Sequence, residues 1–212
     1  MDMQHIGRPQ KTHGLRFGAL GEETLHLCVD MQNLFATGSE WATPWMERVL
    51  PNVVTLIEHK PEDLAFTRFI PLDAPEDGAG TWKRYYERWH AMLRPDLDPR
   101  LLELLDPLTR FAPPAPVFDK KIYSPWWQTD LHARLQAGSR NTLVITGGET
   151  EVCVLATVIG AVDLGYRVIL ATDALCSSAD ETHDAMNKIY HDRFRMQVET
   201  ADISEIMAAW TR

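Results

Sequence analysis

The segment at residues 142–157, TLVITGGETEVCVLAT, restricts the possible folds of this chain more than any other stretch. Its first five residues, 142–146, form an apolar run whose length and β-branched character are typical of a buried parallel strand. Gly147 and Gly148 end that strand, because consecutive glycines adopt backbone angles that other residues resist. An almost unbroken apolar run then predicts a buried helix over residues 152–162.

Cys153 falls in the first turn of this predicted helix, directly after the strand and its glycine turn. Unpaired backbone amides and the positive end of the helix dipole meet at such a place, and both favour a thiolate. Cys153 is therefore a candidate nucleophile. The alternative is a small buried hydrophobic residue, which is what most free cysteines are.

The rest of the chain alternates between short apolar runs and amphipathic stretches. We expect further strands at residues 25–29, 64–70, 116–119, 166–171 and 195–199, and further helices at 44–60, 127–137, 180–190 and 203–210. This alternation predicts an α/β protein, a three-layer α/β/α sandwich with a mainly parallel, Rossmann-like sheet of about six strands. Ligands bind such sheets beyond the carboxyl ends of the strands.

Two regions depart from this pattern. We expect residues 1–24 to be a polar N-terminal arm and residues 25–212 to form a single domain with an aromatic-rich insert at about 71–116. The insert carries Trp82, Tyr85, Tyr86 and Trp89 at helical spacing, which predicts one buried aromatic face. That face is expected to cover the core, to form a lid or to make an oligomer contact. The proline-rich part after residue 95 is expected to follow the surface.

Composition excludes several classes of partner. The net charge of −9 argues against nucleic acid and against anionic membranes. The chain has no run long enough for a membrane span and no apolar block near its start. Its three cysteines are an odd number without CxxC spacing, which indicates a reducing compartment and no disulfide framework. We therefore expect a cytoplasmic protein.

Polar residues follow three of the predicted strands. Asp30 comes after the first, Lys120 after the third in chain order, and Cys153 after the fourth through the glycine turn. The ends of parallel strands share one edge, so a carboxylate, an ammonium and a thiol are expected to meet there. Lys120 would favour the thiolate, and Asp30 would accept the thiol proton and return it to a leaving group. If each residue is considered alone, the simpler interpretation is that Asp30 forms a turn at the end of a strand and that Lys120 is an exposed surface charge.

Three segments also resemble the signature segments of the isochorismatase-like cysteine hydrolases. They are VDMQNLF at 29–35, DKKIYSPW at 119–126 and GGETEVCVLAT at 147–157, and the tail GYRVILATDALCSS followed by His183 is similar to that family as well. The resemblance spans roughly residues 25–200. It implies an Asp–Lys–Cys catalytic triad in a hydrolase of the same α/β fold.

Carried over residue by residue, the resemblance makes Asp30 the general acid and base and Cys153 the nucleophile. The family lysine lies four residues before the serine of a Tyr-Ser pair, which selects Lys120 over its neighbour Lys121. The family also has a non-proline cis peptide before the nucleophile, here at Gly148–Glu149. The backbone amides of Glu149 and Cys153 would then form the oxyanion hole.

The departures from the family pattern concern metals and cofactors. Nicotinamidases of the family carry an Asp-x-His metal motif, which this sequence lacks in the corresponding region, so we predict no metal. Gly147-Gly148 has neither dinucleotide-binding nor P-loop spacing, so we predict no NAD, no ATP and no other cofactor.

The predicted substrate pocket is largely aromatic. Arg68 is expected either to clamp a substrate carboxylate bidentately or to form a structural ion pair. Gln32 is a further polar candidate. The aromatic candidates for the pocket wall, of which about half are expected to touch ligand, are Phe35, Trp41, Tyr123, Trp126 and Trp127.

Together these features predict a cysteine hydrolase that cleaves a C–N bond of a small amide, ureide or carbamoyl compound through an acyl-enzyme. A vinyl-ether hydrolase of the isochorismatase type and a non-catalytic small-molecule-binding protein are the alternatives. The apolar insert and the segment near Trp126 also predict a homo-oligomer, a dimer or a tetramer.

Overall fold

The computed structural model describes residues 15–36 and 38–211, and at its centre lies a six-stranded sheet of order β3-β2-β1-β4-β5-β6. Every neighbouring pair of strands in this sheet is parallel. The predicted three-layer α/β architecture is confirmed. In chain order the strands are β1 (Thr24–Val29), β2 (Leu64–Phe69), β3 (Val117–Lys120), β4 (Thr142–Gly148), β5 (Arg167–Cys176) and β6 (Val198–Ala201).

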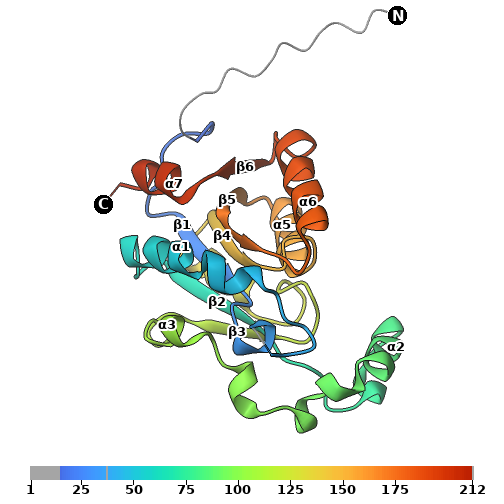
Figure 1. Cartoon of the computed structure of the whole chain (residues 1–212). Coiled ribbons are helices and arrows are strands. Elements are labelled where there is room, and N and C mark those ends of the chain that lie inside the picture. Colours follow the sequence, from blue (N-terminus) through green and yellow to red (C-terminus); the bar gives the residue numbers. More distant parts are fainter. Residues whose placement is uncertain (1–14, 37, 212) are drawn as a thin grey trace, which may run out of the picture.

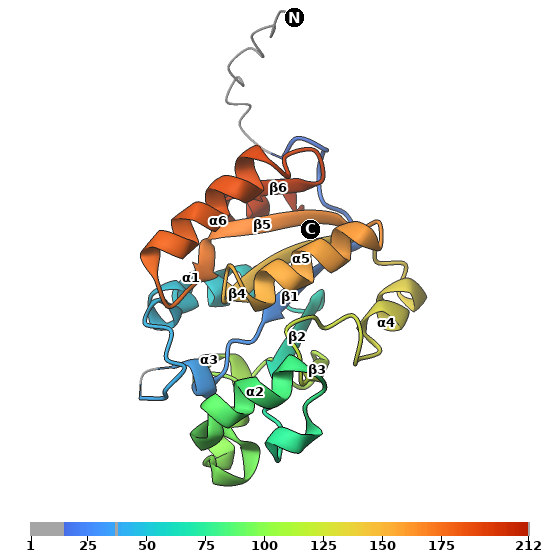
Figure 2. The same cartoon turned by 90° about the vertical axis from the view of Figure 1, so that its right-hand side faces the viewer.

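Helices cover both faces of the sheet (Figure 1, Figure 2). On one face, α1 (Trp45–His59), α3 (Asp106–Thr109) and α7 (Ile203–Ala209) contribute to one buried apolar cluster. On the other, α4 (Leu131–Ala137), α5 (Cys153–Asp163) and α6 (Asp180–Asp192) contribute to a second. The strands supply alternate side chains to the two clusters, which is why their sequences read as continuous apolar runs.

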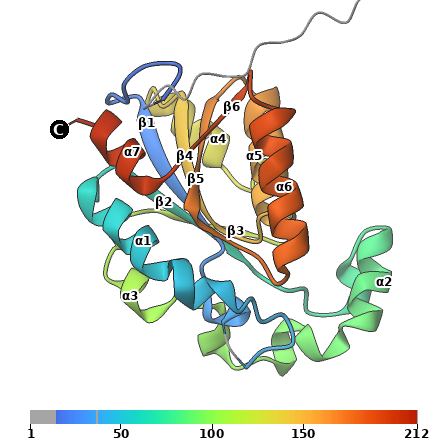
Figure 3. The ribbon, with the colours of Figure 1, turned by 45° about the horizontal axis from the view of Figure 1, so that its top comes forward.

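The insert leaves the sheet after β2 and returns at β3. It contains α2 (Thr81–Arg88), which stands away from both helical layers (Figure 3). Short 3-10 turns complete the region: η1 (Asn33–Phe35) after β1, and in the insert η2 (Pro75–Asp77), η3 (His90–Met92), η4 (Arg94–Asp96) and η5 (Pro99–Leu102). A third, small apolar cluster joins the insert to the sheet through Leu34, Phe69 and Met92.

Four expectations about local structure differ from what is observed. The strand expected at residues 166–171 continues to Cys176 as β5. The helix predicted from residue 127 begins at Leu131, after a turn in which the Thr129 hydroxyl donates to the Pro125 carbonyl at 2.7 Å. The last strand begins at Val198 instead of residue 195, after a turn in which the Val198 amide donates to Phe194. The proline-rich part of the insert also reaches the core, with Leu104, Leu105, Leu108 and Ala115 buried.

The glycine pair at the end of β4 is required by close packing on both sides. Gly147 has a positive φ of 103°, and a Cβ there would lie 2.1 Å from the carbonyl oxygen of Val29 on β1. A Cβ on Gly148 would lie 2.7 Å from the sulfur of Cys176 on β5. Only glycine permits the end of β4 to lie this close to its neighbours on both sides.

The N-terminal arm is described in part, since residues 1–14 lie outside the described ranges. Its described end packs on the last strand and helix: Arg16 donates to the Val198 carbonyl at 3.0 Å, and the Leu20 amide donates to that of Ala209 at 3.0 Å. Across residues 15–36 and 38–211, no helix has the length and apolar character to cross a bilayer.

Candidate active site

Asp30, Lys120 and Cys153 converge at the carboxyl edge of the sheet. Asp30 directly follows β1, Lys120 is the last residue of β3, and Cys153 is the first residue of α5, which follows β4. The Lys120 ammonium nitrogen, Nζ, lies 2.6 Å from Asp30 Oδ2 and 3.5 Å from Cys153 Sγ. All three residues are buried, with exposed fractions of 1%, 1% and 6%. Lys120 therefore bridges the carboxylate and the thiol.

Thr67 on β2 fixes the orientation of the Asp30 carboxylate. Its hydroxyl donates to Asp30 Oδ1 at 2.6 Å, which leaves Oδ2 for Lys120. The Asp30 backbone has a φ of 50°, a left-handed conformation that aspartate tolerates better than most residues. The Asp30 amide donates to the Thr67 carbonyl at 3.2 Å. Strand β2 thus supplies a positioning residue that the sequence patterns did not reveal.

The electrostatics differ from the expected stabilised thiolate. Burial raises the pKa of the Cys153 thiol well above its ordinary value, and the Lys120 ammonium opposes this increase without cancelling it. Burial acts to lower the pKa of Lys120, but the charges of Asp30 and Cys153 outweigh it and the pKa is raised. Burial therefore disfavours the Cys153 thiolate, and the Asp30 carboxylate favours the charged form of Lys120. A hydrogen bond to Asp30 further favours the neutral thiol.

The loop between β4 and α5 surrounds the thiol with backbone groups. The Gly148–Glu149 peptide bond is cis. The Glu149 carbonyl accepts from the amides of Val152 and Val154, each at 3.0 Å. Within the described part of the chain, neither the Glu149 amide nor the Cys153 amide donates to a protein acceptor. Both amides are therefore available to a ligand oxygen.

Thr150 connects this loop to α6. Its hydroxyl lies 2.9 Å from His183 Nδ1 and donates to the Cys176 carbonyl at 3.0 Å. His183 Nε2 in turn lies 2.8 Å from the Asn187 amide nitrogen, Nδ2, and the Tyr190 hydroxyl donates to the Thr150 carbonyl at 2.9 Å. These contacts give His183 the structural role that is commonest for a histidine outside the triad.

A cavity of about 370 Å³ opens above Cys153, within the size range of small-molecule sites. Three of the predicted substrate residues line it, namely Phe35, Trp41 and Tyr123. Of the ten others, the sequence patterns also singled out Gly148, Glu149 and Cys153 at the glycine turn, and Tyr85 and Trp89 through their helical spacing. They did not single out the remaining five. The further lining residues are Glu40, Ala42, Phe69, Tyr85, Trp89, Gly148, Glu149, Val152, Cys153 and Ser178.

The polar substrate-binding candidates lie elsewhere. The Gln32 side chain donates to the Phe69 and Leu102 carbonyls at 3.2 and 2.9 Å, and accepts from the Phe69 amide at 2.6 Å. Gln32 therefore joins the end of β1 to the end of β2 and to the insert.

Arg68 lies outside the cavity as well. It donates to both carboxylate oxygens of Asp119, at 2.8 and 3.0 Å, and to Glu103 at 3.1 Å. Of the two roles considered for Arg68, the structure shows the structural ion pair. An arginine that uses its donors on two protein carboxylates is not placed to clamp a substrate.

The two tryptophans after Tyr123 do not line the cavity. The indole N–H of Trp126 donates to the Thr157 carbonyl at 2.9 Å, and its ring stacks on Tyr166 at a centroid distance of 5.6 Å. Trp126 therefore holds the β3–α4 connection against α5. Trp127 is 83% exposed. Neighbouring aromatic residues in sequence consequently have three different environments, which local sequence does not reveal.

Comparisons with known proteins agree with this fold. Residues 24–202 match the Isochorismatase domain. An uncharacterized isochorismatase family protein of Bacillus subtilis is 30% identical over 86 residues, which are 41% of this chain and 46% of that protein. The chain thus spans under half the length of that relative.

Two solved structures extend the likeness to almost the whole chain. A cysteine hydrolase from Pseudomonas syringae pv. phaseolicola superposes with a TM-score of 0.76 and 19% identity, over 94% of this chain and 98% of that one. An N-carbamoylsarcosine amidase from Thermoplasma acidophilum superposes with a TM-score of 0.67 and 20% identity, over 85% and 96% of the two chains. At these identities the likeness establishes the shared fold.

Proposed function

Because the chain belongs to the isochorismatase family of hydrolases, we propose that it is a cysteine hydrolase that cleaves a C–N bond of a small amide, ureide or carbamoyl compound. The observation that carries the proposal is the Lys120 bridge, whose ammonium lies 2.6 Å from the Asp30 carboxylate and 3.5 Å from the Cys153 sulfur. A thiol and a proton acceptor held by one cation are the parts that an acyl-transfer reaction needs.

In the first half of the reaction, Asp30 takes the proton of the Cys153 thiol as the sulfur attacks the substrate carbonyl carbon. Removing this proton during the attack suits a thiol whose pKa is raised by burial. The carbonyl oxygen becomes an oxyanion, to which the Glu149 and Cys153 amides donate. Asp30 then gives the proton to the substrate nitrogen, the C–N bond breaks, and ammonia or an amine leaves.

In the second half, water attacks the carbonyl carbon of the thioester on Cys153. Asp30 accepts one proton from that water, the C–S bond breaks, and the sulfur recovers its proton as the acid is released. Throughout the cycle Lys120 stays protonated, which its raised pKa permits, and it stabilises whichever of Asp30 and Cys153 carries negative charge. The cycle uses only residues of this chain and water.

Vinyl-ether hydrolysis of the isochorismatase type is the competing reaction. It requires a proton donor such as Asp30 but no thiol. The placement of Cys153 under the cavity, with its sulfur beside Lys120, favours the amidase.

Replacing Cys153 with alanine or serine separates these possibilities. We expect both variants to keep the circular dichroism spectrum of the wild type and to lose turnover of every substrate found in a panel of small amides, ureas and carbamoyl compounds. Undiminished amide hydrolysis by Cys153→Ala would refute the mechanism. A wild-type protein that hydrolyses no amide and forms no adduct would support the non-catalytic alternative.

Assembly and location stay predictions. The structure places the aromatic face of the insert partly against the cavity, which removes one of the two reasons for expecting a homo-oligomer. The other reason was the apolar segment near Trp126, and the exposed Trp127 is consistent with it. We propose a dimer or tetramer in the cytoplasm, and a monomeric mass by light scattering would contradict the assembly.

A further inference from the structure

The charge of the cavity wall is negative. Two of its lining residues, Glu40 and Glu149, are acidic, and no described lining residue is a lysine, arginine or histidine. Lys120 lies close by, but its ammonium is paired with the Asp30 carboxylate at 2.6 Å, so those two charges cancel. The two glutamates therefore set the net charge that a ligand meets in the cavity.

Neither glutamate is neutralised by a neighbouring cation. Glu40 is exposed, and within the described ranges it forms no ion pair. Glu149 Oε1 accepts from the Ser178 amide at 3.1 Å, a contact with a neutral group. Burial raises the pKa of Tyr123, and negative charge on Cys153 and then on Glu149 raises it further, so Glu149 acts electrostatically on a residue of the cavity wall.

Aromatic rings make up most of the remaining wall. Trp41 is central, with its ring centroid 6.4 Å from that of Phe35, 6.0 Å from Phe69, 5.9 Å from Tyr85 and 6.2 Å from Trp89. The faces of such rings attract cations. The Lys120 ammonium already uses one of them, lying 5.3 Å from the centroid of Phe69.

We propose that the substrate carries a small organic ammonium group, which the aromatic wall and Glu40 bind while its amide or carbamoyl carbon lies above Cys153. The proposal concerns the substrate class and rests on the hydrolase function proposed above. Aromatic cages beside a carboxylate are how proteins recognise quaternary ammonium compounds. The overall charge of −9 would also raise the local concentration of a cationic substrate. Among the described residues that line the cavity, none is a cation that could pair with an anionic substrate, and Arg68 binds Asp119 and Glu103 instead.

The first test measures binding and requires no chemistry. The probes are choline and its neutral isostere 3,3-dimethylbutan-1-ol, which replaces the nitrogen with carbon and keeps the shape. Binding to the wild-type protein is followed by tryptophan fluorescence, because Trp41 and Trp89 line the cavity. We expect choline to bind about tenfold more tightly or better. Equal affinities, tighter binding of the neutral probe, or binding of neither would overturn the proposal.

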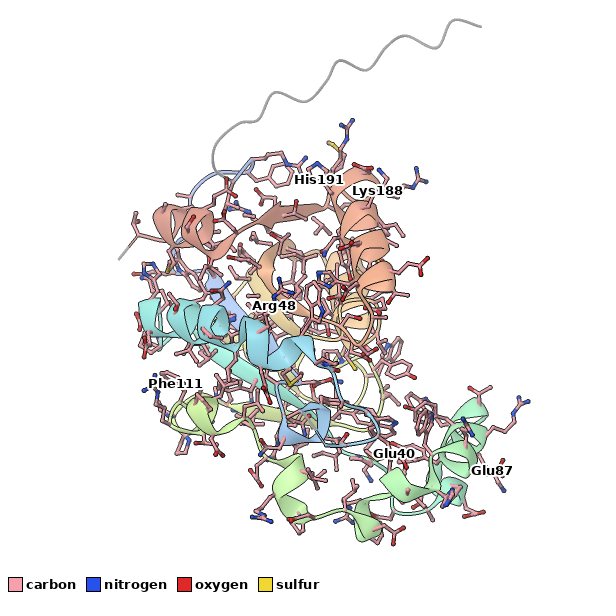
Figure 4. The ribbon with its side chains drawn as sticks, viewed as in Figure 1. Glu40, Arg48, Glu87, Phe111, Lys188 and His191 are labelled. Atoms are coloured by element: carbon pink, nitrogen blue, oxygen red, sulfur yellow. The ribbon has the colours of Figure 1, made fainter. Side chains whose placement is uncertain are left out.

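A matched pair of variants tests the acidic side chain. Figure 4 labels Glu40, on the segment before α1, and Glu87, on α2. Glu87 is exposed and does not line the cavity, so Glu87→Gln makes the same change of charge away from the site. We expect Glu40→Gln to reduce the preference for choline over its isostere by about threefold or more, and Glu87→Gln to leave it within error. The same preference in both variants would overturn the role of Glu40.

Hydrolysis of matched amides distinguishes failure of this inference from failure of the proposed function. The pair is the amide of trimethylglycine, a cation, and 3,3-dimethylbutanamide, its neutral isostere. Because the ammonium group itself activates the neighbouring carbonyl, the measured quantity is the ratio of kcat/KM for the cation to that for the neutral amide. We expect a ratio of about tenfold or more in the wild type, lowered by about threefold or more in Glu40→Gln and unchanged in Glu87→Gln. Equal rates, or a preference for the neutral amide, would contradict the ammonium site and leave the hydrolase intact. Selective choline binding without hydrolysis of any amide would contradict the hydrolase and leave the ammonium site intact.

Discussion

The carboxyl edge of the sheet and the insert between β2 and β3 contribute to one cavity in different ways. The sheet edge supplies the buried, mutually hydrogen-bonded group of Asp30, Lys120 and Cys153, each fixed by the strand or helix that carries it. The insert supplies Tyr85 and Trp89, which are partly exposed and whose rings both contact that of Trp41. The sheet edge carries the groups that we propose to react, and the insert contributes residues to the wall of the cavity above them.

The two regions are therefore expected to have different roles, the sheet edge in the reaction and the insert in the choice of substrate. The parallel strands bring the reactive groups together through hydrogen-bonded registers, which admit little variation without loss of the fold. The rings of the insert meet no such constraint, so an exchange of one ring changes the pocket without disturbing the triad. We therefore expect substitutions at the sheet edge to abolish turnover, and substitutions in the insert to change which substrate binds.

The largest effect is expected for Lys120. In Lys120→Met the side chain keeps a similar length but leaves Asp30 and Cys153 without their shared cation. We expect kcat/KM to fall by about 10³-fold or more. Its neighbour provides the control, because Lys121 is exposed. Lys121→Met should keep kcat/KM within about twofold of the wild type. Equal activity of the two variants, with both folded by circular dichroism, would remove Lys120 from the mechanism.

A second prediction concerns the thiol at the sheet edge and its dependence on pH. Burial raises the pKa of Cys153, so the thiolate fraction should still be rising above the pKa of about 8.5 of an ordinary thiol. Alkylation of Cys153 by iodoacetamide, followed by peptide mass spectrometry, should accelerate by about 100-fold from pH 7 to pH 9. A rate that levels off below pH 8 would show instead that Lys120 and the helix amides stabilise the thiolate.

Cys28 is the comparison within the same experiment. Burial raises the pKa of its thiol to about 12, and it is fully buried on β1 and does not line the cavity. It should stay unmodified in the folded protein at every pH in this range. Labelling of Cys28 at the rate of Cys153 would show that the cavity does not control access.

The smallest effect is expected in the insert. Trp89→Leu removes one ring from the cavity wall and leaves the triad untouched. We expect KM for the best substrate to rise by about tenfold and kcat to change by less than about threefold. Trp127→Leu is the matched control, since Trp127 is 83% exposed and lies outside the cavity. A fall in kcat as large as that of Lys120→Met would erase the distinction between the two regions.

The sequence was informative where backbone periodicity determines position. Alternating apolar runs predicted the layers of the sheet, and residues after strand ends were expected at one edge because parallel strands end together. The same argument does not predict the role of Thr67. This residue lies within β2 and donates a hydrogen bond to Asp30, which follows the neighbouring strand β1. Nor does it show that burial outweighs Lys120 at the Cys153 thiol, because desolvation depends on every surrounding atom.

Pocket residues were harder to predict. Phe35, Trp41 and Tyr123 line the cavity, whereas Trp126 packs on Tyr166 and Arg68 binds Asp119. An aromatic or arginine residue has the same local pattern in both environments. Whether such a residue lines the cavity depends on contacts between segments that are distant in sequence. The hydrophobic periodicity of a single sequence does not predict those contacts.

The central claim is that Cys153 becomes acylated during turnover. Rapid quenching of the wild-type protein with a hydrolysed substrate, followed by intact-protein and peptide mass spectrometry, tests it directly. The account predicts a mass increase equal to the acyl group, located on the peptide that contains Cys153 and absent from Cys153→Ala. Turnover with no adduct at any time point, together with full activity of Cys153→Ala, would contradict it.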